Sequence, residues 1–200
     1  MEVRRLSADD AGVVAGVLAR AFDDDPVWRW IVPKADGRVR RLTPVFELIT
    51  RKVHEPRGAC EVGGRGGIEA AALWDPPGAW RVPLSVQLRQ LVPLARAFGI
   101  RLPAALRALS AIEARHPVEP HWYLAVLGTD PVAQGNGLGG ALLRSRLERC
   151  DEERLPAYLE SSKESNVPYY ERFGFRVTER FVPPGGCPPV WLMWRPPLQG

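Results

Sequence analysis

A glycine-rich segment, QGNGLGG at residues 134–140, constrains this chain more than any other feature of its sequence. It follows a continuous apolar run, HWYLAVLGT at residues 121–129, which predicts a central strand buried on both faces. A helix of about 15 residues is expected after the glycines. Backbone N–H groups that converge in such a turn, together with the partial positive charge of a helix N-terminus, bind anions. The segment therefore predicts a pyrophosphate site.

The same segment contains the pattern G-x-G-x-x-G of dinucleotide-binding proteins, and Glu160 lies where an acidic residue would bind the ribose. In those proteins, however, the first glycine follows the strand almost immediately, whereas here residues 130–134 intervene. A hairpin also precedes the motif where repeated βαβ units are required. A nicotinamide or flavin oxidoreductase is thus the less favoured alternative. A simpler interpretation is that the glycines only allow tight packing.

The remaining sequence alternates between strand and helix patterns, and 200 residues suffice for a single domain. Further helices are expected at residues 7–22, 38–55 and 165–173, and further strands at residues 2–6, 58–63, 67–74, 156–160, 175–182 and 190–195. Between residues 83 and 115, apolar residues recur at helical spacing with breaks at Gly99 and Pro103. This pattern predicts a helical insertion.

Composition excludes several classes of function. Three cysteines lie far apart without a CxxC pair, so neither a disulfide framework nor a metal site is predicted. The net charge of +4 comes from arginines scattered among acidic residues, which does not indicate a nucleic-acid partner. Because the sequence contains no signal peptide and no apolar run of about 18 residues, a cytoplasmic protein without a membrane partner is expected.

Two motifs carry a family resemblance. Residues 127–139, LGTDPVAQGNGLG, resemble the acetyl-CoA motif of the GNAT N-acetyltransferase superfamily, in which a strand and a proline precede Arg or Gln and then G-x-G. Residues 166–175, NVPYYERFGF, resemble the late signature of the same family. Within it, residues 121–196 are similar to puromycin N-acetyltransferase and its relatives, whereas residues 1–75 match only loosely.

The resemblance implies an α/β (α+β) fold with a mixed, mostly antiparallel sheet whose fourth and fifth strands splay apart to admit acetyl-CoA. The implied cofactor-binding residues are Leu127, Gly128, Thr129, Gln134, Gly135, Asn136, Gly137, Leu138, Gly139, Gly140 and Asn166. Many members have Asn seven residues before their catalytic tyrosine, where this chain has Lys163. Two alternatives stay open: Asn166 replaces that residue in part, or Lys163 binds a phosphate.

Tyr170 matches the family's tyrosine that protonates the departing thiolate, and Tyr169 is expected to pack in the core. Two residues are equal candidates for the base: His121, at the start of the central strand, and Glu160, at the end of the fifth strand. Large aromatic residues are expected on the acceptor side, above all Trp28, Trp30 and Trp122, with Phe22 and Trp80 as further candidates.

The predicted function is direct transfer of an acetyl group from acetyl-CoA to a primary amine of a small molecule in a ternary complex. The alternative from another class is a non-catalytic module that binds or senses CoA. The sequence does not identify the amine. A homodimer is possible, formed by pairing of the strand at residues 190–195 with a second chain.

Overall fold

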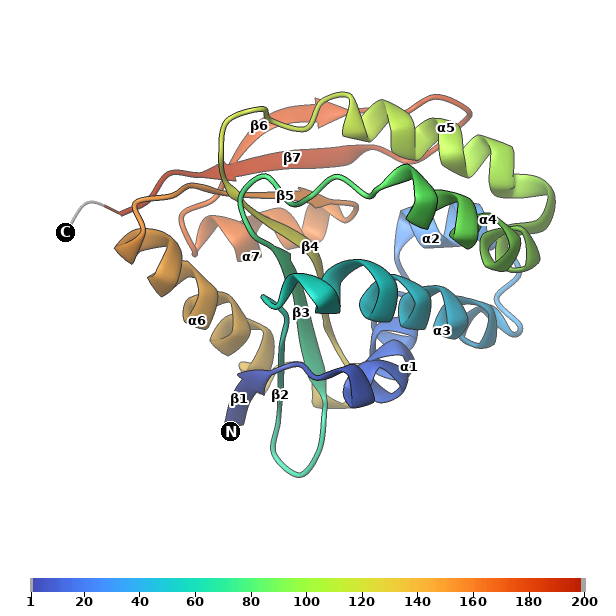
Figure 1. Cartoon of the computed structure of the whole chain (residues 1–200). Coiled ribbons are helices and arrows are strands. Elements are labelled where there is room, and N and C mark those ends of the chain that lie inside the picture. Colours follow the sequence, from blue (N-terminus) through green and yellow to red (C-terminus); the bar gives the residue numbers. More distant parts are fainter. Residues whose placement is uncertain (1, 199–200) are drawn as a thin grey trace.

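The computed structural model describes residues 2–198 and contains one seven-stranded sheet with helices on both faces (Figure 1). The strand order is β1-β2-β3-β4-β5-β7-β6, and only β4 and β5 are parallel neighbours. The strands are β1 (Glu2–Arg5), β2 (Glu61–Gly64), β3 (Ala70–Asp75), β4 (Trp122–Thr129), β5 (Ala157–Ser161), β6 (Arg176–Phe181) and β7 (Val190–Arg195). This arrangement confirms the predicted mixed, mostly antiparallel sheet.

Helices cover the sheet from two sides. They are α1 (Ala11–Ala21), α2 (Pro26–Ile31), α3 (Arg38–Ile49), α4 (Leu84–Phe98), α5 (Leu102–Glu113), α6 (Leu138–Glu152) and α7 (Val167–Glu171). Helix α6 packs on β2, β3 and β4 from one side, and α1 packs on β3 and β4 from the other side (Figure 1). Helix α3 packs against α1. Three apolar clusters result: one beneath α6, one beneath α1 and α3, and a smaller one around Tyr158, Val190 and Leu192.

Most elements agree with the sequence patterns, and the differences have local causes. The helix predicted over residues 38–55 ends at Ile49, and a π-helical turn (Thr50–His54) and a 3-10 turn (Glu55–Arg57) continue it. Gly58, with φ of +74°, then turns the chain toward β2. The strands of the hairpin are shorter than predicted because the loop between them occupies residues 65–69.

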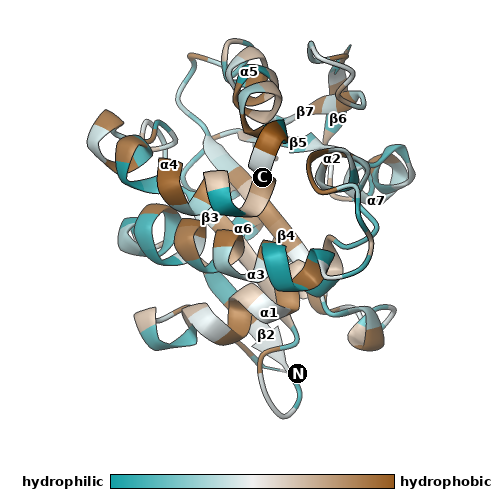
Figure 2. Cartoon of the chain, turned by 90° about the vertical axis from the view of Figure 1, so that its right-hand side faces the viewer, coloured by the Kyte–Doolittle hydropathy of each residue, from teal (hydrophilic) through white to brown (hydrophobic). Residues whose placement is uncertain are grey.

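The helical pattern predicted between residues 83 and 115 is present as α4 and α5, joined by a 3-10 turn (Gly99–Arg101). Gly99 adopts a φ of +54°, and Pro103 lies in the first turn of α5, where its missing N–H costs nothing. Figure 2 shows brown and teal alternating along the ribbons of α3 and α4, as expected for amphipathic helices. Among residues 2–198, no helix combines the length and apolar character needed to cross a bilayer.

A bulge in β4 separates two neighbouring strands. Leu73 pairs with Val126 but Trp74 pairs with Leu124, so Ala125 is an extra residue in β4. An extra residue bends its strand and increases the local twist. Residues 122–124 pair with residues 157–159 of β5, and beyond these pairs the two strands diverge. The splayed strands that the family resemblance implied are therefore present.

The predicted route to a homodimer through residues 190–195 is wrong. Strand β7 pairs with β5 on one side and with β6 on the other, so neither of its edges is free for a second chain. The edge strand on this side of the sheet is β6, whose residues are almost all exposed. A homodimer by another surface stays a prediction.

The hairpin between β2 and β3 requires glycine at one position. A Cβ atom at Gly64 would lie 1.7 Å from the carbonyl oxygen of Gly67, whereas a Cβ atom at Gly66 would meet nothing within 4 Å. We expect Gly64→Ala to lower the free energy of unfolding by about 1–3 kcal/mol. Gly66→Ala is the matched control and is expected to change it by less than about 0.5 kcal/mol. Urea denaturation measures both, and equal stabilities would contradict the described packing.

Candidate active site

A cleft of about 790 Å³ lies where β4 and β5 diverge. Its walls come from the second half of β4, the glycine-rich segment, the end of β5, the loop between α1 and α2, and α7. The sequence-predicted site residues in its walls are Leu127, Gly128, Thr129, Gln134, Gly135, Gly137, Leu138, Gly139, Gly140, Glu160, Asn166 and Tyr170. Thus the structure brings most of the predicted residues together, although they span more than forty positions of the sequence.

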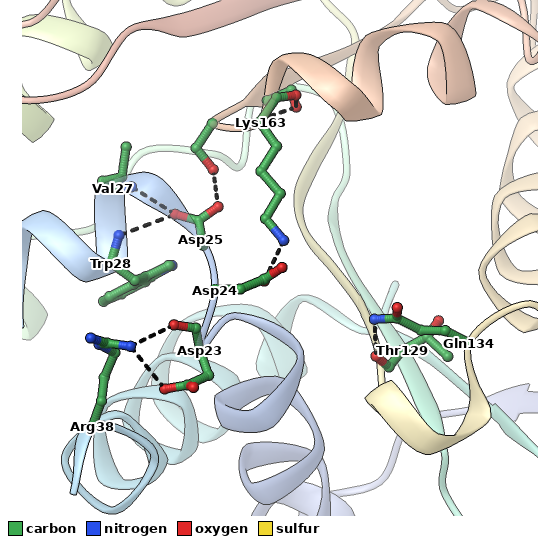
Figure 3. A network of polar contacts seen from close by, with 11 residues as sticks. Asp23, Asp24, Asp25, Val27, Trp28, Arg38, Thr129, Gln134 and Lys163 are labelled. Carbon is green, nitrogen blue, oxygen red and sulfur yellow. Dashed lines mark hydrogen bonds and ion pairs between the residues drawn. The ribbon is translucent and has the colours of Figure 1, made fainter. Parts of the chain in front are cut away.

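The five residues between β4 and the glycines form an ordered turn. Asp130 lies at its start and accepts a hydrogen bond from the backbone N–H of Val132 (3.3 Å), while its other oxygen pairs with Arg20 (2.5 Å). The Gln134 amide donates to the carbonyl oxygen of Thr129 (3.2 Å; Figure 3). This turn places the glycine-rich segment at the mouth of the cleft.

Asn136 is a predicted site residue that does not line the cleft. Its side-chain amide instead donates to the carbonyl oxygen of Ala133 (3.2 Å), which holds the turn in place. Gly135 and Gly137 adopt φ values of +80° and +79°, a region that favours glycine. In these two positions glycine is required for the path of the backbone.

The glycine-rich segment ends at the N-terminus of α6, which begins without a side-chain cap. The first N–H groups of a helix have no partner within the helix, and the helix dipole adds positive charge there. Arg144, in the second turn of α6, and Arg172, beyond α7, also line the cleft. This end of the cleft is therefore suited to a polyphosphate, and the sequence analysis did not single out the two arginines.

Tyr170 contributes a buried phenol to the wall of the cleft. Its ring packs against Tyr169 (5.4 Å between centroids) and Phe175 (6.0 Å). Burial, helped by the nearby Tyr169 and Asp25, raises the pKa of Tyr170 above its ordinary value. The phenol therefore keeps its proton at neutral pH and is able to donate it.

Carboxylates gather at another part of the cleft, on the loop between α1 and α2. One oxygen of Asp25 accepts from the backbone N–H groups of Val27 (2.9 Å) and Trp28 (3.1 Å) and so caps α2. The other accepts from the Ser162 hydroxyl, just beyond β5 (Figure 3). Burial raises the pKa of Asp25, although the Ser162 hydrogen bond opposes this.

A second contact ties the same loop to β5. Lys163 pairs with Asp24, whose side chain is 72% exposed (Figure 3). The amine of Lys163 thus points toward a carboxylate in this structure, which does not favour the alternative that it binds a phosphate. Asn166 and Lys163 both line the cleft, so the alternative in which Asn166 replaces the family's asparagine in part stays a prediction.

The two candidate bases are placed differently. Glu160 lines the cleft, and one of its oxygens accepts from the Tyr123 hydroxyl (2.7 Å). His121 is buried, with 2% of its surface exposed, and does not line the cleft. Its Nε2 lies 3.0 Å from Nε2 of His116, and Nδ1 of His116 lies 3.5 Å from Glu160. His116, which the sequence analysis missed because it lies in a loop without a motif, separates His121 from Glu160.

The three predicted tryptophans lie outside the cleft. Trp122 packs beneath α6, under the guanidinium of Arg146 (4.7 Å), and donates from its indole nitrogen to Glu153 (2.8 Å). The first residue of β4 faces α6, whereas the cleft opens beyond the bulge. Trp28 packs against Phe46 on the α3 side (5.1 Å). Trp30 lies near Arg101 (6.0 Å).

The other aromatic candidates have different places. Phe22, at the end of α1, lines the cleft. Trp80 stacks on the His116 ring at 3.8 Å between centroids, behind Glu160. The sequence showed that large aromatic residues were available but not which of them the helices would cover.

Comparisons with known proteins agree with this geometry. Residues 103–190 match the family described as "Acetyltransferase (GNAT) domain". An uncharacterized N-acetyltransferase of Schizosaccharomyces pombe is 32% identical over 191 residues, which cover 88% of this chain and 74% of that protein. The chain belongs to the GNAT acetyltransferase family. Members are acyl-CoA-dependent N-acetyltransferases, so the identification from two motifs is confirmed and the oxidoreductase alternative is not supported.

Solved structures share the fold of this GNAT protein over nearly its whole length. A Corynebacterium glutamicum protein, described as histone acetyltransferase HPA2 and related acetyltransferase, superposes with a TM-score of 0.74 at 27% identity, covering 99% of this chain and 97% of the other. A Drosophila melanogaster polyamine N-acetyltransferase gives 0.62 at 19% identity, covering 98% and 99%. An agmatine N-acetyltransferase gives 0.61 at 22% identity, covering 96% and 97%. The last two show the fold alone, and the narrower resemblance to puromycin N-acetyltransferase stays a prediction.

The carboxylates on the α1–α2 loop differ in what they hold together. Asp25→Ala removes the cap of α2 and the link to Ser162, and we expect it to lower the free energy of unfolding by about 1–2 kcal/mol. Asp24→Ala removes an exposed ion pair and is expected to cost less than about 1 kcal/mol. Urea denaturation of the two variants distinguishes them. A larger loss for Asp24→Ala would contradict the assigned roles.

Proposed function

We propose that this GNAT protein transfers an acetyl group from acetyl-CoA directly to a primary amine of a cationic small molecule. The observation that carries the proposal is the cleft between β4 and β5, because one opening combines an anion-binding turn, a protonated phenol and a group of carboxylates. Each of these groups corresponds to one requirement of the reaction: binding of CoA, protonation of its thiolate, and deprotonation of the amine.

The cofactor site is proposed along the second half of β4. Beyond Leu124 this strand no longer pairs with β5, so backbone groups of Leu127 and Thr129 are available to pair with the amides of pantetheine, as an added strand would. The pyrophosphate then lies at the N-terminus of α6, with Arg144 and Arg172 supplying further positive charge.

The proposed reaction needs no covalent enzyme intermediate. The amine nitrogen attacks the carbonyl carbon of the thioester, a C–N bond forms, and the C–S bond breaks. Tyr170 gives its proton to the departing thiolate, because burial keeps the phenol protonated until that charge develops. One proton of the ammonium passes to a base before the attack, and the proton that the nitrogen loses as the amide forms returns to the Tyr170 phenolate.

Glu160 is the better placed of the two candidate bases. Its carboxylate lines the cleft, where an amine is able to reach it directly. His121 is separated from the cleft by His116, and its Nδ1 is bound to the carbonyl oxygen of Glu119 (2.6 Å). A group that takes a proton from the substrate must lie within hydrogen-bond reach of it. We therefore assign the base to Glu160.

The acceptor is proposed to carry a second cation. Asp24, Asp25 and Glu160 contribute negative charge to the same cleft. To bind a cationic ligand, Asp24 gives up only its exposed ion pair with Lys163, and such pairs contribute little to stability. A diamine or an aminoalkylguanidine fits this pattern, with one amine at Glu160 and the second cation at Asp24. Two proteins of the same fold are described as acting on polyamine and agmatine.

Acetylation of agmatine and of n-butylamine tests the proposal, because butylamine has the amine without the guanidinium. We expect kcat/KM for agmatine to exceed that for butylamine by about tenfold, which corresponds to one favourable charge contact of about 1.4 kcal/mol. Free-thiol release follows the reaction. The protein's own thiols interfere little, because burial raises the pKa of Cys60 and Cys150 to about 12 and that of Cys187 to about 11.

The outcomes of this test separate the alternatives. Equal rates with the two amines would contradict the second cation site. Binding of acetyl-CoA without release of thiol from any amine, with spermidine included as a third acceptor, would favour the module that binds or senses CoA.

A second test concerns the proton donor. We expect Tyr170→Phe to lower kcat by about 100-fold, since general acids typically contribute that much or more, while the Kd for acetyl-CoA changes little. The matched control is Tyr169→Phe, which removes a neighbouring cleft hydroxyl and is expected to lower kcat by less than about fivefold. Steady-state kinetics and calorimetry measure the two constants. A similar loss of kcat in both variants would contradict the assignment to Tyr170.

A further inference from the structure

A pair of buried histidines lies behind Glu160, on the side away from the cleft. His116 has 2% of its side chain exposed, and its Nδ1 lies 3.5 Å from an oxygen of Glu160. On the opposite side of its ring, Nε2 lies 3.0 Å from Nε2 of His121. The Nδ1 atom of His121 in turn lies 2.6 Å from the carbonyl oxygen of Glu119. The three side chains therefore form one line of polar contacts that ends at a backbone carbonyl.

The carbonyl oxygen of Glu119 determines which atom donates in each hydrogen bond of this line. A carbonyl oxygen only accepts, so Nδ1 of His121 carries a hydrogen. Burial, together with the nearby His116, lowers the pKa of His121, so its ring is neutral and its Nε2 is an acceptor. It follows that Nε2 of His116 donates to His121.

The same reasoning leaves one unsatisfied contact. A neutral imidazole has a single N–H, so Nδ1 of a neutral His116 presents a lone pair toward Glu160. Two acceptors that face each other in a buried site repel. One additional proton, held either on Nδ1 of His116 or on the facing oxygen of Glu160, converts this contact into a hydrogen-bonded or ionic one.

The surroundings hold His116 in place. Trp80 stacks on the imidazole ring at 3.8 Å, and the edges of Tyr123 and Tyr158 contact it at 4.7 and 4.9 Å. Carboxylates and arginines both surround the pair: Arg115 is bound to Glu179, Arg57 is bound to Asp75, and Arg81 lies over the Trp80 ring (5.1 Å). These carboxylates are Glu113 from α5, Glu119 from the following loop, Asp75 from β3 and Glu179 from β6.

We propose that His116 and Glu160 act as one proton-accepting unit, in which His116 is the positioning residue that stabilises the proton taken from the amine by Glu160. This inference rests on the proposed function. Before transfer the unit holds a carboxylate and a neutral imidazole. The ammonium gives one proton to the unit, where it lies between Glu160 and Nδ1 of His116, and the lone pair left on nitrogen attacks the thioester.

Spectra of the three histidines test the unit without any substrate. The chain has only three histidines, so ¹⁵N-imidazole spectra contain three ring systems, and His116→Gln and His121→Gln assign two of them. We expect the His116 ring to gain its second proton at a pH at least one unit higher in the wild-type protein than in Glu160→Gln. His121 stays in the Nδ1–H form throughout. Equal midpoints for His116 in both proteins would overturn the proposal.

The pH dependence of turnover tests its role in catalysis. With acetyl-CoA and agmatine, we expect wild-type kcat/KM to fall as the pH decreases, because a unit that already holds a proton is unable to accept one from the amine. In His116→Gln we expect this acidic limb of the kcat/KM profile to move at least one pH unit lower, and kcat at pH 7 to decrease about tenfold. Glu47→Gln, which removes a carboxylate paired with Arg51 outside the cleft, is the control and leaves the acidic side of the pH profile unchanged.

These results separate the inference from the proposed function. An unmoved acidic limb in His116→Gln would overturn the unit even if acetyl transfer is confirmed. If no amine is acetylated, the proposed function fails, while the histidine spectra still decide whether His116 and Glu160 share a proton. Thermal melting of each variant verifies that it is folded.

Discussion

The bulge at Ala125 is the feature on which the rest of the site depends. The bulge bends β4 against β3, and the pairing of β4 with the parallel strand β5 ends at the preceding residue, Leu124. In an uninterrupted sheet, the backbone of Leu127 and Thr129 would be occupied by β5. Because the strands diverge, the turn at Gly135 and Gly137, the start of α6 and the end of β5 all face the same opening.

One wall of the cleft is formed by contacts between parts of the chain that are far apart in the sequence. Asp25 caps α2 and also binds Ser162 beyond β5, so a single carboxylate joins the first helical segment to the fifth strand. Asp24 and Lys163 add a second, more exposed contact. The buried contact fixes the shape of the cleft, whereas the exposed one is able to exchange with a ligand. This difference is the physical basis for proposing a cationic acceptor.

Sequence patterns predicted the fold, and they indicated most of the residues that line one half of the candidate site. The glycine-rich segment, the proline turn before it and the motif around Tyr170 are local, so their spacing indicated both the elements and their chemistry. The acceptor side depends on contacts between residues far apart in the sequence. Nothing local indicates that Trp122 faces α6, or that Trp80 stacks on His116.

The same limit applies to the base. His121 and Glu160 were equal candidates in the sequence because both lie at strand ends, and only the fold shows that one faces the cleft and the other lies behind it. His116 carries no motif, and its importance follows from three contacts made by the folded chain. The pairing of β7 with two neighbours was equally hidden, since the sequence does not state the order of strands.

Calorimetric titration with acetyl-CoA, with NAD and NADPH titrated in parallel, tests the central claim most directly. The account predicts that one acetyl-CoA binds per chain with a Kd in the micromolar range, and that the nicotinamide cofactors give no binding heat. No heat with acetyl-CoA, together with binding of a nicotinamide cofactor, would contradict the assignment of the cleft between β4 and β5 to CoA.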